Sequence, residues 1–459
     1  MAKHIRCGKL FTGLADKALS DQTVVVEGTA IAQVGPTAEA PEPAAGDSVV
    51  DHSGHFVMPG LIDVHVHLAY GNAKSEEDID LFASVEFRAL RGLEAAQRVL
   101  LAGYTALADP ATTGLVTPAI RDAIDVGLFA GPRITASGKQ LTNRQGLSDW
   151  YPSWIGVPET SLGELARTAE EGIKAIRLQI KNGVDFIKIA MDGDSMNPST
   201  DVLVSGYDQE ETSAMIGEIH RLGKKVVVHA RGAEAVKYSA RAGADVILHA
   251  SWMDGEGLDA VLENDCALCP TFSLVVNDIE FTRPGDGCYP AFPDAHKKEL
   301  EAAQQNLAPA KQAGARFLAG SDAGFAVTPY GEWHARELEH MTRYLGFSNA
   351  EVLKITTVNT AGFVREGAAI GAIEAGREAD ILCLDADPLA DISVLQDRSR
   401  IAEIFLAGAP VRASINENAR RLRSEFSYAM WADVYTQAKV AEVGLADGRS
   451  LKGPREAAE

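Results

Sequence analysis

The sequence predicts an α/β protein: an eight-stranded parallel (β/α)8 barrel of the TIM type beside a small β-sandwich built from both ends of the chain. Three observations predict it. Apolar runs of strand length recur after glycines, segments of helix length separate most of these runs, and both flanks contain short strands without helices between them. The predicted boundaries are 59–370 for the barrel, 1–58 and 371–417 for the sandwich, and 418–459 for a helical extension.

The barrel strands are expected where a helical stretch ends at a glycine and a β-branched run follows. Eight strand candidates begin near residues 61, 103, 132, 184, 225, 246, 266 and 316. The glycines at these junctions have the position of helix C-terminal caps, and they are Gly103, Gly183, Gly223, Gly243 and Gly314. Helices are expected over residues 79–102, 161–182, 209–223 and 295–313. An open doubly wound sheet also alternates, but it rarely needs eight units, and the chain contains no glycine-rich dinucleotide fingerprint.

The flanks have a different pattern. "TVVVEGTAIAQVG" near the start and "IAEIFLAGAPVRA" near residue 401 are short strands punctuated by glycine. Each flank is too small for its own core, so we expect the two to form one domain. In the last forty residues Leu422, Phe426 and Met430 recur at helical spacing, which suits a packed surface helix, an arm over the barrel or an oligomer contact. A homo-oligomer is expected.

Composition excludes several classes of partner. The net charge of −21, with no basic run to offset it, argues against nucleic acid and anionic membranes. The start of the sequence lacks the apolar core of a signal peptide, and no segment has eighteen uninterrupted apolar residues. Five cysteines fit a reducing compartment, and Cys266 and Cys269 are interpreted as strand residues. We therefore expect a cytoplasmic protein that acts on a small molecule.

Titratable side chains stand at the ends of the strand candidates. In "GLIDVHVHLAY" the alternation of a strand points His65 and His67 to the same side. Four further motifs end other strands: "DFIKIA" with Lys188, "VVVHA" with His229, "VILHA" with His249 and "FLAGSD" with Asp322. Because the carboxyl ends of barrel strands meet at one rim, these six side chains are expected to form one site.

Each of these residues alone has an ordinary structural explanation. Lys188 could belong to a buried ion pair, His229 and His249 could be hydrogen-bonded core histidines, and Asp322 could cap a helix. Together they match a metal site better, because Zn²⁺ accepts imidazole and carboxylate ligands and keeps a position open for water.

These motifs, in this order, resemble the binuclear branch of the amidohydrolase superfamily from about Val25 to Val411. The likeness includes the segment "GAIEAGREADILCLDADPLADISVL", which in that superfamily returns the chain to the β-sandwich. Within the superfamily the sequence is most similar to the prolidase-like and ochratoxinase-type members, which also include hydrolases of ureas and carbamates. The resemblance supports the barrel with its sandwich.

The resemblance implies two divalent metal ions, Zn²⁺ by default, with Co²⁺ or Mn²⁺ able to use the same ligands. His65, His67 and Asp322 would bind the first ion, and His229 and His249 the second. Lys188, converted by CO₂ to a carbamate, would bridge the two. A hydroxide between the ions would attack a carbonyl carbon, and Asp322 would pass its proton to the leaving nitrogen. The implied reaction is hydrolysis of a carbon–nitrogen bond.

Departures from the subgroup's pattern bear on the substrate. Leu147 stands where a loop histidine is usual, and bulky side chains follow His249. Phe272 and Leu274 are expected to extend the strand that begins near residue 266. Apolar surface near the strand ends suits an N-acyl or aryl amide, a urea or a carbamate, although core packing is the alternative for each residue. The predicted substrate contacts are Leu147, Trp150, Trp154, Met191, Tyr207, Arg231, Trp252, Met253 and Phe272.

Three other functions stay open. Tyr207 and Arg231 could orient a carboxylate, which suits an Xaa-Pro or Xaa-Arg dipeptidase. A mononuclear deaminase would share the histidines and the aspartate but does not need Lys188. A barrel without activity could serve as an interaction protein, but such a protein is expected to have lost some of the six side chains.

Overall fold

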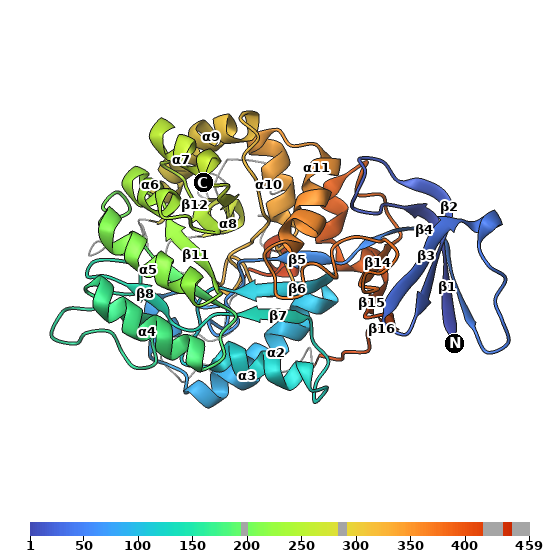
Figure 1. The fold of residues 1–459 in the computed structure, drawn as a ribbon, viewed down its shortest axis with the longest axis horizontal. Coiled ribbons are helices and arrows are strands. Elements are labelled where there is room, and N and C mark those ends of the chain that lie inside the picture. The colour runs from blue at the N-terminus through green and yellow to red at the C-terminus, as the bar shows by residue number, and fades with distance from the viewer. Residues whose placement is uncertain (194–200, 283–291, 416–434, 443–459) are drawn as a thin grey trace.

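In the computed structural model, which describes residues 1–193, 201–282, 292–415 and 435–442, both flanks of the chain join one sheet. Its seven strands have the order β16-β15-β14-β4-β1-β2-β3. Strand β4 runs antiparallel to β14, with Met58 opposite Leu382, and this pairing connects the two flanks. The strands are β1 Ala2–Leu10, β2 Leu19–Glu27, β3 Ala30–Pro36, β4 Ser48–Pro59, β14 Ile381–Leu384, β15 Ile401–Leu406 and β16 Ala409–Pro410. Figure 1 shows this sheet at one side of the larger body; the two-layered sandwich stays a prediction.

The larger body contains two parallel sheets. The first has the order β5-β6-β7 and the second β13-β12-β11-β10-β8-β9. Their strands are β5 Leu61–Asp63, β6 Tyr104–Asp109, β7 Arg133–Ala136, β8 Gln140–Thr142, β9 Gly163–Leu165, β10 Phe186–Ala190, β11 Lys225–Ala230, β12 Val246–His249 and β13 Ala267–Cys269. Seven of the eight strand candidates are found here, and β8 and β9 were not expected. Cys266 and Cys269 are buried free thiols at β13.

The last strand candidate, near residue 316, does not form a regular strand in the described chain. The segment lies between the two parallel sheets and bonds to both. Leu318 N–H donates to Leu268 O at 2.9 Å, and Val64 N–H donates to Ala319 O at 3.0 Å. Isolated parallel bridges join Leu268 with Phe317, and Val66 with Ala323. The segment therefore connects β13 to the chain that follows β5.

Helices alternate with the strands of the larger body (Figure 1). The described α-helices are α1 Glu76–Asp80, α2 Val85–Leu101, α3 Val116–Asp125, α4 Ala169–Lys181, α5 Gln209–Arg221, α6 Ala233–Arg241, α7 Gly255–Glu263, α8 Phe272–Phe281, α9 Phe292–Gln312, α10 Arg336–Leu345, α11 Asn349–Lys354 and α12 Gln437–Glu442. All five junction glycines have positive φ, as a left-handed helix cap requires. The expected helix over 79–102 is two helices, and β9 occupies the start of the one expected over 161–182.

One sequence prediction is wrong at β13. Phe272 was expected to extend that strand, but it begins α8, because Thr271 turns the chain with φ +56°. The carboxylate of Glu337, from α10, accepts the N–H groups of Phe272 at 3.0 Å and Ser273 at 2.7 Å. A cap supplied from 65 residues further along the chain leaves no local sequence signal.

The carboxyl-terminal prediction is only partly covered by the structure. The helical extension was predicted from the spacing of Leu422, Phe426 and Met430. These three residues lie outside the described residues. In the described part, Tyr435 packs against Phe281, and α12 follows. No helix in the described ranges has the length and apolar character needed to cross a membrane.

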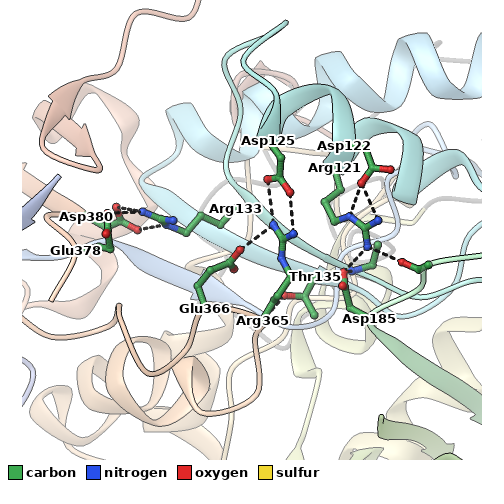
Figure 2. A network of polar contacts seen from close by, with 12 residues as sticks. Arg121, Asp122, Asp125, Arg133, Thr135, Asp185, Arg365, Glu366, Glu378 and Asp380 are labelled. Carbon is green, nitrogen blue, oxygen red and sulfur yellow. Dashed lines mark hydrogen bonds and ion pairs between the residues drawn. The ribbon is translucent and has the colours of Figure 1, made fainter. Parts of the chain in front are cut away.

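Ion pairs connect the amino-terminal ends of the parallel strands to the chain that enters β14 (Figure 2). Arg133, the first residue of β7, contacts Asp380 at 2.8 Å and Glu378 at 3.3 Å. Arg365 binds Asp125 of α3 at 2.7 Å. These contacts lie at the opposite ends of the strands from the predicted metal site, so they join the two parts of the molecule without entering that site.

Candidate metal centre

The structure brings the six predicted ligands to one cavity. Each comes from, or directly after, a strand or the segment near residue 316, and each side chain is buried. They are His65, His67, Lys188, His229, His249 and Asp322. The carboxyl ends of the parallel strands therefore supply the polar wall of this cavity.

Two of these residues have a backbone conformation that side chains other than glycine rarely adopt. His249 has φ +70° and Asp322 has φ +56°, both in the left-handed region. Such conformations cost free energy and persist where the surrounding structure holds them, which is common at functional sites. The turn directs each side chain inward at the point where its strand ends.

Asp322 lies between the imidazoles of His65 and His67. Its Oδ1 is 3.3 Å from His65 Nε2 and 3.2 Å from His67 Nε2. His67 Nδ1 lies 3.3 Å from the carbonyl of Ala111, so Nε2 is the ring nitrogen that faces the carboxylate. Imidazole nitrogens that converge on one carboxylate oxygen are donor atoms that a divalent metal ion accepts. The chemistry of the donor set thus fits a metal ion.

The protonation states at this first set suit metal binding. Burial lowers the pKa of His65 well below its ordinary value, so the imidazole is neutral. Burial alone would raise the pKa of Asp322, but its imidazole neighbours His65 and His67 outweigh burial and hold the pKa below its usual range. Neutral imidazole and ionised carboxylate are the forms that coordinate metals.

His249 lies beside His229 and also beside His65 and Asp322. Its ligand atom, with those of His65 and Asp322, forms a group within 4.8 Å. Thr271 donates its hydroxyl to Pro270 O at 2.7 Å, and its Oγ1 lies 2.5 Å from His249 Nδ1. His249 Nδ1–H is therefore the donor of that bond, and its Nε2 keeps a lone pair for the cavity.

His229 stands beside His249, with ring centroids 4.7 Å apart. Its Nε2 lies 3.0 Å from Gly193 O, a hydrogen-bond acceptor, and 3.1 Å from Arg231 Nη1, a donor. Burial, followed by the charges of Arg231 and Lys188, lowers the pKa of His229 well below its ordinary value.

Lys188 is 1 % exposed in the middle of β10, where an ammonium ion has little hydration. Burial lowers the pKa of Lys188 from 10.5 to about 7, even though the charge of Asp322 opposes the shift. A substantial share of this side chain is therefore neutral amine near neutral pH. A neutral amine is the form that reacts with CO₂.

Three carboxylates hold the site from outside, and the sequence did not assign them. Asp63 Oδ1 accepts the N–H groups of His65 and Ser321, and Oδ2 contacts His334 Nδ1 at 2.8 Å. Asp109 accepts the N–H of Leu68 and the hydroxyl of Thr117, and Asp192 accepts the N–H groups of Arg231 and Gly232. Asp63 and Asp109 end their strands, which is the only sequence signal they offered.

Of the nine predicted substrate contacts, Leu147, Trp150 and Arg231 line the cavity. The structure does not bring the other six to it. Trp154 is 84 % exposed, and Trp252 is half-buried. Tyr207 donates its hydroxyl to Ala166 O at 2.7 Å, inside the core. The remaining three are buried in the hydrophobic core: Met191, Met253 and Phe272.

Four further residues line the cavity: Tyr70, Gln140, Leu274 and Phe325. Tyr70 stacks on His67 with ring centroids 4.2 Å apart and an interplanar angle of 3°. Its position three residues after His67 was the available signal. Leu274 reaches the cavity from α8 rather than from the extended strand that was predicted, and Phe325 carried no signal, because the loop after Asp322 reaches the cavity only in the folded chain.

Comparison with known proteins agrees with this geometry. The family model described as "Amidohydrolase family" matches residues 56–411. The ochratoxinase of Aspergillus niger is 27 % identical over 417 residues, covering 85 % of this chain and 82 % of that protein. A solved Xaa-Pro dipeptidase with bound methionine is 26 % identical with a TM-score of 0.80, covering 90 % of this chain and 100 % of the other. Phenylurea hydrolase B is 25 % identical with a TM-score of 0.72, covering 90 % and 97 %.

Proposed function

Because the chain belongs to the amidohydrolase family and is therefore a hydrolytic enzyme, we propose that it uses two metal ions to cleave an apolar N-acyl or aryl amide, urea or carbamate. The observation that carries the proposal is one cavity in which the six buried candidate ligands face apolar walls.

In this proposal His65, His67 and Asp322 would hold the first ion, and His229 and His249 the second. Lys188, as a carbamate, would supply oxygen ligands, which its burial and lowered pKa support. Zn²⁺ is the default, and Co²⁺ or Mn²⁺ use the same donors. When bound, such ions polarise a carbonyl oxygen and increase the acidity of water.

The chain's own groups have separate tasks in the proposed reaction. Asp322, an ionised carboxylate in the cavity, accepts a proton from water at its Oδ atoms and delivers it to the leaving nitrogen. Without that proton the amine is a poor leaving group. The low exposure of all six polar side chains keeps bulk water from competing for the substrate.

The walls support an apolar substituent. Tyr70, Leu147, Trp150, Leu274 and Phe325 surround the polar floor of the cavity. Aromatic and aliphatic side chains of this kind stabilise aryl and alkyl groups by burying their surface, at about 25 cal/mol per Å². A charged dipeptide would gain little from these walls and would lose hydration on entering them.

A dipeptidase is the second candidate, favoured by the cationic Arg231 in the cavity and by the structural likeness to an Xaa-Pro dipeptidase. Against it, Arg231 Nε already binds the carboxylate of Glu299 at 2.7 Å, with both side chains buried. A substrate carboxylate would have to share a guanidinium whose charge is already paired.

A substrate panel tests the proposal. The metal-loaded enzyme is given matched N-aryl amides, ureas and carbamates beside Xaa-Pro and Xaa-Arg dipeptides, and kcat/KM is compared. We expect at least one apolar series to exceed every dipeptide by about tenfold or more. Faster cleavage of the dipeptides than of every apolar compound would replace this proposal with the second candidate.

Metal content tests the two-ion centre. We expect about two ions per wild-type chain by elemental analysis, and fewer than one in Lys188→Ala, because the bridging group is lost. Lys181→Ala, at the exposed end of α4, is the control and is expected to keep both ions. One ion per chain together with full activity in Lys188→Ala would favour a mononuclear centre.

Three predictions about the fold, the domains and the assembly belong to the same proposal. The hydrogen bonds of residues 316–323 to both parallel sheets support a closed eight-stranded barrel. The pairing of β4 with β14 supports the composite domain of 1–58 and 371–417. A cytoplasmic homo-oligomer remains our expectation, and sedimentation of the purified chain would test the assembly.

A further inference from the structure

Beside the six candidate ligands, the cavity of the metal centre is lined by four residues with polar side chains. They are Tyr70, Gln140, Trp150 and Arg231. Trp150 Nε1 donates to Asp80 Oδ2 at 2.9 Å. Arg231 Nε donates to Glu299 Oε1 at 2.7 Å. Tyr70 and Gln140 differ from these two, because each keeps one polar atom without a hydrogen-bond partner in the described part of the chain.

Gln140 begins β8 beside the strand that carries Lys188. Leu141 of β8 pairs with Ile189 of β10 in a parallel register. One position earlier in each strand, Gln140 and Lys188 therefore project to the same side of the sheet. The backbone N–H of Gln140 donates to Leu162 O at 2.9 Å, which holds this end of β8 in place. The Gln140 amide is thus positioned next to a candidate ligand.

The side-chain amide of Gln140 is fixed at one end and open at the other. Its Nε2 donates to Ser148 Oγ at 2.7 Å, and Ser148 is completely buried. None of the described groups donates to Oε1, and this oxygen is not fully enclosed by protein. Because Gln140 lines the cavity, Oε1 is a fixed hydrogen-bond acceptor in the cavity wall.

Tyr70 adds a hydrogen-bond donor beside His67. Its ring stacks on the imidazole with centroids 4.2 Å apart and 3° between the planes, and Phe325 packs edge-on against it at 5.1 Å. These contacts fix the ring and do not use the hydroxyl. Within the described ranges the hydroxyl has no hydrogen-bond partner and is not fully enclosed. A phenol keeps its proton at neutral pH, so this hydroxyl can donate.

An acceptor and a donor in one cavity select what a substrate must offer. A secondary amide, an N-aryl urea and an N-aryl carbamate each carry an N–H donor and a carbonyl acceptor in one planar group. An ester has the carbonyl without the N–H, and so has an Xaa-Pro peptide bond. A substrate that leaves a buried acceptor unpaired binds more weakly, because that acceptor has given up its water.

We propose that Gln140 and Tyr70 recognise the reacting group itself. Gln140 Oε1 accepts the N–H of the bond that is cleaved, and the Tyr70 hydroxyl donates to the carbonyl oxygen. The enzyme therefore selects carbon–nitrogen bonds whose nitrogen bears a hydrogen. Metal ions alone do not provide this selectivity, since they polarise the carbonyl of an ester and of an amide alike. The inference rests on the proposed function, because the same reacting group lies over the metal ligands.

A matched pair of substrates separates the two contacts. The 4-nitroanilide and the 4-nitrophenyl ester of phenylacetic acid share the acyl group and the aryl ring, and differ in N–H against O. Both are given to the metal-loaded enzyme, and the spontaneous hydrolysis of the ester is subtracted. We expect Gln140→Met to lower kcat/KM for the anilide about tenfold and to leave that for the ester within about twofold. Tyr70→Phe keeps the stacked ring and is expected to lower both about tenfold.

Two control variants remove the same chemical groups elsewhere. Gln209→Met removes an amide that donates to Ser213 Oγ at 3.1 Å on α5, and Tyr238→Phe removes a hydroxyl beside Glu234 on α6. Both are expected to leave the two rates unchanged. Elemental analysis is expected to find the wild-type metal content in Gln140→Met and in Tyr70→Phe. A loss of ions in either variant would overturn its contact, because that residue would then act on the metal ligands.

The outcomes separate this recognition from the proposed function. If both substrates are cleaved but Gln140→Met changes the anilide and ester rates equally, the N–H contact is overturned while the function stands. Unchanged rates in Tyr70→Phe overturn the contact to the carbonyl oxygen. If neither substrate is cleaved, calorimetry with N-phenylurea decides. Binding to the wild type that both variants weaken supports the recognition, and equal or undetectable binding overturns it.

Discussion

Single residues outside the ligand set determine how the candidate metal centre is held. Asp63 is the clearest case, because it binds the backbone N–H of His65 at 2.9 Å and that of Ser321 at 3.1 Å. These two residues precede His67 and Asp322. One carboxylate therefore sets the relative position of two strand ends that are far apart in the sequence.

We expect Asp63→Asn to weaken metal binding about 10- to 100-fold, as is usual when a group that orients metal ligands is changed. The amide replaces a charged acceptor shared by His65, Ser321 and His334. Competition with a chelator, read by elemental analysis, measures the effect. Asp122→Asn is the control, since that side chain is 65 % exposed. Equal metal affinity in both variants would contradict the role of Asp63.

At the scale of elements, α8 depends on a cap from elsewhere in the chain. Its first N–H groups bind Glu337, which is buried. Burial raises the pKa of Glu337 from 4.5 to about 7, against the effect of the hydrogen bonds from Phe272 and Ser273. The helix that contributes Leu274 to the cavity of the candidate metal centre is therefore linked to pH.

The sign of this link follows from proton uptake. Between pH 4.5 and 7 the folded chain keeps a proton on Glu337 that the unfolded chain has lost, so this group makes stability fall as pH rises through that window. In Glu337→Gln the contribution is absent. We expect the wild type to lose stability relative to this variant by up to about 1.4 kcal/mol per pH unit there, and no further above pH 8. Urea unfolding at pH 5, 6, 7 and 8 measures it; a constant difference would refute it.

The described carboxyl-terminal segment is a second element held by a few contacts. Tyr435 N–H donates to Ala326 O at 2.9 Å, and Trp333 Nε1 donates to Tyr435 O at 2.7 Å. The Tyr435 ring stacks with Phe281, 6.0 Å between centroids. The segment thus supports the loop whose Phe325 lines the cavity of the candidate metal centre.

Tyr435→Ala should lower the free energy of unfolding by about 3 kcal/mol, because a buried ring is lost from this cluster. Tyr238→Ala removes a half-buried ring from the surface of α6 and is expected to cost less. Thermal unfolding of both variants provides the comparison. A smaller effect for Tyr435→Ala than for Tyr238→Ala would show that the segment does not stabilise the loop.

At the scale of the whole molecule, ion pairs join the seven-stranded sheet to the parallel sheets. The guanidinium of Arg133, from β7, pairs with the carboxylate of Asp380 just before β14 (Figure 2). Asp380 is 4 % exposed. The site lies at the other ends of the strands. Stability and catalysis are therefore separable here.

We expect Arg133→Ala to cost about 3 kcal/mol of stability, because Asp380 is left buried without its cation. The kcat of the folded enzyme should stay within about twofold of the wild type. The exposed Arg167–Glu171 pair offers the control Arg167→Ala, expected to cost about 0.5 kcal/mol. Urea unfolding and steady-state rates measure both; a loss of kcat in the folded variant would contradict this separation.

The sequence by itself determined the parts that depend on local pattern. Apolar runs of strand length, glycines that end helices and the titratable residues at the strand ends are all encoded within a few neighbouring positions. The family resemblance added roles to six of those residues. Seven of the eight strand candidates and the pairing of the two flanks follow from the same short-range information.

Only the tertiary structure decided which side chains meet. Leu274 and Phe325 enter the cavity, whereas Trp154 points into solvent and Met191 into the core, because a side chain's direction depends on how whole elements pack. The start of α8 depends on Glu337, which comes from α10. Contacts between positions far apart in the chain leave no pattern in either stretch alone, so folding was needed to reveal them.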